Sequence, residues 1–503
     1  MKLRPSLRVL PLVAALGAGF AATAQAQSLL ALYESARAYD ATWQSAKAQY
    51  DANLFRAEQA KAGILPSANL GAGITRSAFE NDQPSIDRKF TTRTATLSAS
   101  QPLYRPANFA TYEQGKRQVE LAQAQLTAAS QDLIIRVSQA YFDVLAAQDT
   151  LAFVRAQKAA VAEQLASAKR NFEVGTSTIT DSREAQARYD LVIAQEIAAE
   201  NDLQVKKVVL DQLVGRPGSV PVPLRVPVVL PTAMPADINA WVAQADEVHP
   251  AIQQARLGLD VAGLEVEKAK AGHKPTLDAN LGYNVTRNPT GTSTSTVGTR
   301  INAATVGVTF NLPLFAGFAT ENRIKETLAL EDQSRSVLDG TKRSVAQATR
   351  AAYLGLVSGA GQVKALEAAE ASSQSALDAN RLGYQVGVRI NIDVLNSQSQ
   401  LFQTKRDLAQ ARYNVLLGNL KLRQANGTLT IDDMNAINAT LASSGSVPAV
   451  PPATGPDRNT TTPAVTPPSI PVIPPVPVPP FNPPAPTMPT APVPPVILNP
   501  PVR

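Results

Sequence analysis

The sequence of 503 residues contains no cysteine and only two histidines, His249 and His273. Without cysteine there is neither a disulfide framework nor a thiol nucleophile, and we expect no lipid anchor of the kind attached to an N-terminal cysteine. Two isolated histidines exclude a histidine-rich metal site. His249 precedes Pro250, as at a helix start, and His273 precedes an expected strand. A Gly-rich phosphate-binding loop followed by Lys and Ser or Thr is also lacking. The sequence therefore predicts no enzyme, no cofactor and no metal site.

Long hydrophobic runs are scarce. The one apolar stretch, from Val9 to about Ala22, follows three basic residues and precedes the small-residue cleavage site Ala24-Gln25-Ala26. This order is typical of a secretory signal peptide, which we predict over residues 1–26. No other run reaches the roughly 18 apolar residues that a transmembrane helix needs, so we expect no such helix in the exported chain.

An excess of one charge is missing as well. Three of the 47 basic residues lie in the expected signal peptide, which leaves 44 basic against 41 acidic residues in the exported chain. The two signs alternate along helical stretches, as on a solvated surface. The composition therefore indicates no nucleic-acid partner.

The sequence does contain an internal repeat. Pro66 begins P-SANLG and Pro275 begins P-TLDANLG, and Gly175 and Gly387 follow valine at equivalent places. The offset between matching positions is 209 to 212 residues throughout. We therefore expect two homologous halves. The predicted divisions are a first repeat at 27–215, a Pro-rich linker at 216–235, a second repeat at 236–427, and a C-terminal segment at 428–503 whose Pro-rich tail cannot build a core.

Each half contains two stretches in which apolar and polar residues alternate. In the second half Leu277, Ala279, Leu281, Tyr283 and Val285 share one face, and a second run covers 304–312. The first half repeats the pattern at 68–74 and more weakly at 92–103. Strict alternation over roughly 9–12 residues fits strands that cross a membrane, with one face toward lipid and the other toward water. We expect long polar loops at 79–90 and 287–300.

Very long helices are the other prominent feature. From Pro106 to Phe172 no further proline occurs, and at about 1.5 Å per residue this stretch would reach roughly 100 Å. Heptad-like apolar seams run through it and through the last part of the second repeat; they are Ile134, Val137, Tyr141, Val144 and Leu151, and Leu401, Leu408, Val415 and Leu422. Such seams predict long antiparallel helix pairs.

Four membrane strands cannot close a barrel, because known barrels begin at about eight. Open strand edges in lipid would leave backbone groups unpaired. We therefore predict a mixed fold: an α-helical barrel of long antiparallel coiled coils plus a transmembrane β-barrel with four strands per chain and twelve in a homotrimer. The alternative is a structural or adhesive coiled-coil surface protein without a conducting lumen, which would not need two-faced strands.

The order of these features, and several local strings, resemble the TolC family of outer-membrane efflux and type I secretion channels. The similar strings include AYFDVLAAQDTLAFVRAQKAAVAEQL, RNFEVGTSTITDSREAQARYD and LDANRLGYQVGVRINIDVL. The resemblance covers about residues 27–430. It implies a trimeric channel in the cell outer membrane, contacting outer-membrane lipid, with a large periplasmic portion. It also implies an inner-membrane pump, docked through a periplasmic adaptor (membrane fusion) protein. Protein secretion and drug efflux both remain open.

Two turns between helices are candidate docking sites. They comprise Val174, Gly175 and Thr176 in the first half, and Val386, Gly387 and Val388 in the second. Glycine allows the positive φ angle of such a turn, and closing a turn is the alternative role for both glycines. The resemblance implies that these tips meet the adaptor.

The resemblance also implies a gate and an acidic ring near the tips. The gate residues are Gln164, Thr180 and Asp181 on the first helix pair, and Tyr384 and Arg389 on the second, with Asp181 linked to Arg389 and to the Tyr384 hydroxyl. Asp393 would form the ring at the periplasmic entrance. Two positions depart from the family pattern: Arg381 stands where a glutamate occurs, and Asn396 where some relatives have a second aspartate.

Capping roles are the alternatives for both aspartates. Asp181 would cap its helix, with Glu184 three residues later completing a capping box. Asp393 would cap the helix that follows the second turn.

Overall fold

The computed structural model describes residues 27–83, 85–225, 228 and 230–441. The predicted signal peptide at 1–26 and the Pro-rich tail lie outside these residues. No helix among the described residues is long and apolar enough to cross a membrane.

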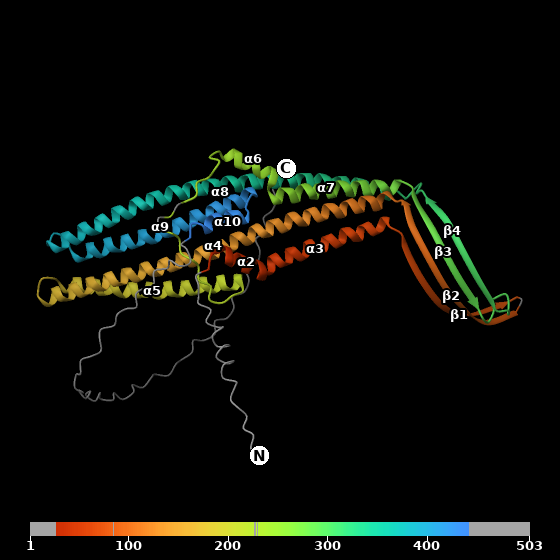
Figure 1. Cartoon of the computed structure of the whole chain (residues 1–503), viewed down its shortest axis with the longest axis horizontal. Coiled ribbons are helices and arrows are strands. Elements are labelled where there is room, and N and C mark those ends of the chain that lie inside the picture. Colours follow the sequence, from red (N-terminus) through yellow and green to blue (C-terminus); the bar gives the residue numbers. More distant parts are fainter. Residues whose placement is uncertain (1–26, 84, 226–227, 229, 442–503) are drawn as a thin grey trace, which may run out of the picture. The chain divides into compact units, whose positions relative to one another are not determined.

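The chain carries the same order of elements twice (Figure 1). In the first half these are α2 (Leu29–Tyr39), α3 (Ala41–Lys61), η2 (Ala62–Ile64), β1 (Ser67–Asp82), β2 (Ser85–Tyr104), α4 (Pro106–Glu173) and α5 (Ile179–Val214). In the second they are α6 (Ile238–Val248), α7 (Pro250–Lys270), η3 (Ala271–His273), β3 (Thr276–Asn288), β4 (Thr299–Asn311), α8 (Ala319–Gln385) and α9 (Asn391–Asn426), followed by α10 (Ile431–Asn438). His249 is the N-cap of α7, accepting from the Ala251 amide at Nδ1, as its place before proline suggested.

The four strands form one antiparallel sheet in the order β1-β2-β3-β4 (Figure 1). The predicted mixed fold of long helices and two-faced strands is confirmed. The predicted loop at 79–90 is wrong, because β1 and β2 continue through it in register and meet at a tight turn after Asp82. Phe79 and Phe90 favour extended backbone, so the polar residues between them lie on strands except at the turn itself. The second loop, at 289–298, joins β3 to β4 as expected.

The helices pack in two ways. Near the sheet, contacts run from α3 to α4, from α4 to α7 and from α7 to α8, which is the same order as the strands that these helices adjoin. Farther from the sheet, α4 pairs with α5 and α8 pairs with α9 (Figure 1). Helix α4 has 68 residues and α8 has 67, so each extends about 100 Å.

Both predicted heptad seams are buried. The largest apolar cluster joins α2, α4, α5, α9, α10 and the linker between the halves. Tyr141 and Phe142 of α4 meet edge to face at its centre, with Tyr413 of α9 on the other side of Phe142. The Tyr413 hydroxyl donates to Asp149 across 2.7 Å. The two halves therefore share a core, rather than forming separate domains.

Tyr141 also fixes the linker. Its hydroxyl donates to the Val222 carbonyl at 2.8 Å and accepts from the Val222 amide at 2.9 Å. Both residues are almost fully buried, and burial raises the pKa of Tyr141 well above its usual value. One side chain thus satisfies both backbone groups of a buried residue that belongs to no regular element.

We predict that Tyr141→Phe destabilises the protein by about 1–3 kcal/mol, because the buried Val222 carbonyl loses its donor while the ring remains. The Val222 amide keeps only its longer bond of 3.3 Å to the Gln27 carbonyl. The midpoint of urea unfolding, followed by the helical circular dichroism signal, measures this. Tyr39→Phe is the matched control, since Tyr39 is 62% exposed. Equal midpoints for the two variants would contradict the role given to the Tyr141 hydroxyl.

Candidate functional site

The sheet exposes a broad apolar face. Leu70 on β1, Leu97 on β2, Leu281 on β3 and Val306 on β4 lie on this face, and Val306 is 84% exposed. Neither face of the sheet is packed against one of the long helices within the described residues. A large apolar surface of this kind requires contact with another apolar medium or partner.

The opposite face is polar and continues toward the helices. Thr96 donates to Asn284 across β2 and β3, and Asn280 donates to Thr309 across β3 and β4. At the junction with the helices, Arg105 binds both carboxylate oxygens of Asp278 at 2.7 Å. This bidentate pair fixes the start of α4 against the start of β3.

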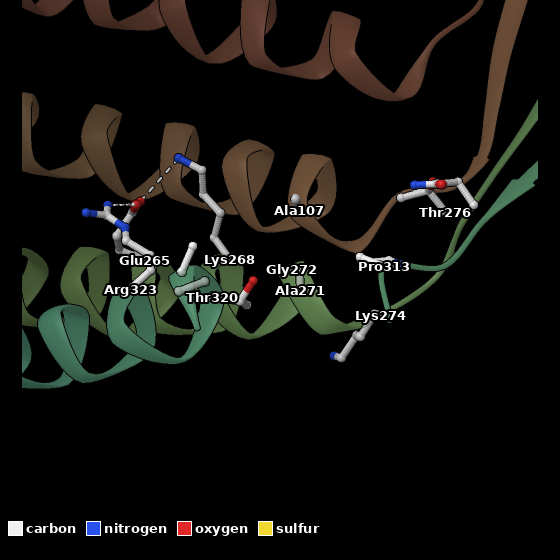
Figure 2. A pocket seen from close by; sticks show the side chains of 13 residues that line it. Ala107, Glu265, Lys268, Ala271, Gly272, Lys274, Thr276, Pro313, Thr320 and Arg323 are labelled. Atoms are coloured by element: carbon white, nitrogen blue, oxygen red, sulfur yellow. Dashed lines mark hydrogen bonds and ion pairs between the residues drawn. The ribbon is translucent and has the colours of Figure 1, made fainter. Parts of the chain in front are cut away.

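A pocket of about 670 Å³ lies beside this junction, between the ends of α7 and η3, the start of α8 and the first residues of the sheet (Figure 2). Glu265 points into a cluster of donors there, accepting from Lys268 and Arg323. Thr276 and Asn311, opposite each other on the polar face of the sheet, also line it. The pocket therefore opens on the polar side of the junction, and it contains more basic than acidic side chains.

Two aromatic residues at the junction, one on β2 and one on β4, lie on the apolar face of the sheet. Tyr104, Leu277 and Phe310 stand opposite one another on β2, β3 and β4 and form what we call the aromatic row. Phe315 and Phe318 follow it and contact each other edge to face. Aromatic side chains concentrate at the interface between lipid and water in membrane barrels.

The two turns at the far ends of the helix pairs have the same backbone geometry. Gly175 and Gly387 have φ angles of 77° and 78°, and each lies just after a helix. The amide of Thr176 donates to the Asn171 carbonyl, and that of Val388 to the Gly383 carbonyl, as in a Schellman motif. A Cβ at either glycine would meet no other atom within 4 Å. These glycines are required by the backbone, and the space around them is open.

The turns also expose valines. Val174, Val386 and Val388 are 71%, 65% and 77% exposed. Apolar side chains at the tips of long helix pairs contribute nothing to the core of the chain. Both turns therefore carry an apolar surface that is free within the described chain.

Asp181 does not cap its helix as expected. Thr178 is the N-cap of α5, and Asp181, three residues later, is its partner in the capping box; Glu184 takes no part. The Asp181 carboxylate accepts from the hydroxyls of Ser177 and Thr178 at 2.7 and 2.8 Å. Burial opposes its ionisation, but these hydrogen bonds outweigh burial, so the pKa of Asp181 lies below its usual value.

The expected link from Asp181 to Arg389 is absent from the described chain. Arg389 instead lies 3.6 Å from Asp393, four residues later. The expected capping role of Asp393 is also wrong, because Ile390 precedes the first residue of α9 and Asp393 lies within the first turn. Both residues of this pair are partly exposed, so it adds little to the stability of the turn.

Other polar contacts join the two helix pairs. Asn391 accepts from the Gln164 side chain and donates to the Asp181 carbonyl at 3.3 Å. Asn171 donates to the Tyr384 hydroxyl at 3.2 Å. Asn391 is buried. Gln164, Asp181 and Tyr384 thus come together near the turns, through two asparagines that sequence reasoning did not identify.

The remaining expected residues lie close by on the surface. Thr180 and Arg381 are exposed, and neither side chain forms a hydrogen bond within the described part of the chain. Asn396 accepts from Arg188 of α5 at 2.8 Å. Asn396 therefore supplies one more contact between the helix pairs. No group of acidic, histidine or cysteine side chains among the described residues could hold a metal ion.

The sequence matches the family described as outer membrane efflux protein at residues 32–216 and again at 241–428. It is 34% identical to the outer membrane protein TolC of Vibrio cholerae, over 86% of this chain and 98% of that protein. It is 31% identical to the alkaline protease secretion protein AprF of Pseudomonas aeruginosa, over 84% of this chain and 89% of that one.

The fold is also that of a solved outer-membrane protein. The crystal structure of the outer membrane protein VceC of Vibrio cholerae superimposes with a TM-score of 0.69 at 19% identity, covering 79% of this chain and 96% of that one. Because the family profile matches both halves, and TolC-like relatives match most of the chain, the protein belongs to the outer membrane efflux protein family and is an outer-membrane protein with a large periplasmic portion.

Proposed function

We propose that three copies of this chain form one channel-tunnel, which exports substrates from a docked inner-membrane pump through the periplasm and the outer membrane. The observation that carries this proposal is the four-stranded sheet, with one apolar face, one polar face and two edges, at β1 and β4, that have no strand partner among the described residues. In lipid, free strand edges leave backbone groups unpaired at a cost of several kcal/mol each. Closure with further copies removes that cost.

The order of the elements supports closure by a single contact repeated around an axis. The sheet ends at β1 and β4, and the helical layer ends at α3 and α8. One copy would therefore place its β4 and α8 edge against the β1 and α3 edge of the next. Twelve strands would enclose a lumen lined by the polar face, and the apolar face would contact outer-membrane lipid. No cofactor, nucleic acid or catalytic step enters this proposal.

The two repeats, 27–215 and 236–427, are joined by the linker at 216–235. With two repeats in each of three copies, every repeat would supply one sixth of the ring around the axis.

The cargo would depend on the partner proteins. The relative AprF is by name an alkaline protease secretion protein, and the family is described as efflux proteins. Type I protein secretion and drug efflux both fit a passive tunnel whose pump selects the substrate.

Docking would occur at the helix turns. Their exposed apolar tips, at 174–176 and 386–388, suit contact with a periplasmic adaptor protein. The glycines give both tips the same shape, so three copies would present six similar sites.

Closure would depend on the polar contacts near the turns. Gln164, Asp181 and Tyr384 join the helix pairs through hydrogen bonds with asparagines, and Arg389 adds a charged side chain beside Asp393. The partly exposed pair of Arg389 and Asp393 contributes only about 0–1 kcal/mol, which suits a gate that opens on docking. Thr180, exposed on α5, would face the neighbouring copy. Three copies of Asp393 would form an acidic ring that attracts cations at the entrance.

The oligomer is the first test. We expect purified protein to be a trimer in detergent, to dissociate on heating, and to conduct ions in planar bilayers, because only closure satisfies the strand edges. Cross-linking with mass measurement and single-channel recording check this. A folded monomer with intact strands, or trimers that never conduct, would refute the channel and favour a structural or adhesive role.

Docking predicts a second result. Val174→Ser with Val388→Ser should reduce pump-dependent export and co-purification of the adaptor at least several-fold, because the tips lose apolar contact area. Trimer yield should not change, since neither side chain is buried in the chain. Val297→Ser, in the loop between β3 and β4, is the matched control at another valine that is 68% exposed. Equal export by both variants argues against docking at the tips.

The gate predicts a third result. Tyr384→Phe removes the acceptor for Asn171, and Arg389→Ser removes the charge beside Asp393. The double variant should show higher single-channel conductance and make cells more sensitive to large antibiotics, at normal trimer yield. Arg343→Ser, on the exposed surface of α8 far from the turn, is the control. Conductance equal to that of the control would exclude these two residues from the gate.

A further inference from the structure

Three arginines stand side by side on the apolar face of the sheet. Arg93 of β2 is paired with Arg287 of β3, which is paired with Arg300 of β4. We call them the arginine row. Because residues two apart on a strand share a face, they lie on the same face as Leu97, Leu281 and Val306. All three arginines are exposed.

Such a row is electrostatically unfavourable by itself. Side chains directly opposite on neighbouring strands are about 5 Å apart at Cβ, and like charges there repel. Among the described residues, none of the three arginines forms an ion pair. The loop between β3 and β4 contains no acidic residue. Farther from the helices on the same face, the first acidic residues are Glu80 of β1 and Asp87 of β2. They are paired with each other, and on this face their pair is the third one beyond the arginine row.

The surroundings add positive charge. Arg76 and Lys89 lie on the same face in the next two rows outward, opposite Thr91 and Ala78. The chain therefore presents five basic side chains in one patch, and three copies would repeat it around a barrel. A patch of this charge has to be balanced by an anion from outside the chain.

Position within the membrane identifies the anion's source. From the aromatic row to the arginine row, β3 runs from Leu277 to Arg287, ten residues or about 33 Å. With a strand tilt of 35–45° this spans about 25 Å across the membrane, the height of the apolar band of outer-membrane barrels. The aromatic row adjoins the helices of the periplasmic portion. The arginine row therefore lies at the outer boundary of the apolar band, at the level of the lipid headgroups.

We propose that the arginine row, with Arg76 and Lys89, binds the phosphate groups of a phosphorylated glycolipid in the outer leaflet, of the lipid A type. Arginine matches phosphate through two parallel N–H donors, and three adjacent guanidinium groups can share two phosphates of one headgroup. The acyl chains would then lie along Leu97, Leu281 and Val306. This inference rests on the proposed function in one respect, that the apolar face of the sheet contacts lipid.

The test compares two triple variants as purified protein in neutral detergent. Arg93→Gln, Arg287→Gln and Arg300→Gln together remove the charge of the row and keep side-chain length. Arg56→Gln, Arg343→Gln and Arg350→Gln remove three exposed arginines from α3 and α8 and serve as the control. The probes are bisphosphorylated lipid A, the same lipid with its phosphates removed, and inorganic phosphate, each measured by titration and by native mass spectrometry.

We expect the unmodified protein and the control to bind bisphosphorylated lipid A with similar affinity, and the row variant to bind it roughly 10- to 100-fold more weakly. The dephosphorylated lipid should bind all three proteins weakly, and inorganic phosphate alone should not compete. Undiminished lipid A binding by the row variant overturns the proposal, and so does competition by inorganic phosphate at equal concentration. Trimer yield and conductance are recorded on the same samples. A protein that binds the lipid through the row without conducting would refute the channel and leave the lipid site standing.

Discussion

The backbone hydrogen bonds at the edges of the sheet are the constraint on which the rest of this structure depends. The chain folds into four paired strands and leaves the outer edges of β1 and β4 without partners in the described chain. Water could satisfy these groups, but the apolar face shows that the sheet is not built for water on both sides. The helices follow the same order as the strands, so one seam extends from the sheet into the helical layer. Sheet and helices can therefore close with a single repeated contact.

Because the two halves repeat, each chain contains the same helices, strands and helix turns twice. The two copies differ where they contact other elements. Both turns have a glycine at positive φ and the same amide-to-carbonyl bond. After the turns the halves diverge: Thr178 caps α5 through a capping box, whereas α9 begins after Ile390 without a side-chain cap. The uncapped helix places Asn391 in contact with the other pair. The helix that lacks a side-chain cap, α9, is thus also the one whose first residue forms hydrogen bonds to the other helix pair.

Much of the fold could be predicted because apolar residues recur at a constant spacing over long stretches of the sequence. Seams of period 3.5 and strands of period two persist over many residues, and each has one structural meaning. The strands at 79–90 could not be predicted, since the charged residues there interrupt the alternation of apolar and polar residues although the strand pairing continues. The register of α5 was missed because serine, threonine and aspartate occur together at 177–181, and any of them can cap a helix. Asn391 gives no signal in sequence, because its role depends on which helices lie beside it.

The distribution of apolar burial indicates which part of the chain can move. Around Tyr141 and Phe142 the helices of both halves share one large core, and at the sheet a bidentate pair, Arg105 with Asp278, fixes helix to strand. Toward the turns the apolar clusters become small, and polar contacts replace them. Elements held by few buried apolar groups open at low free-energy cost. A displacement of the helix ends would therefore leave the shared core and the sheet in place. This limits any gating motion to the turns and the helical segments next to them.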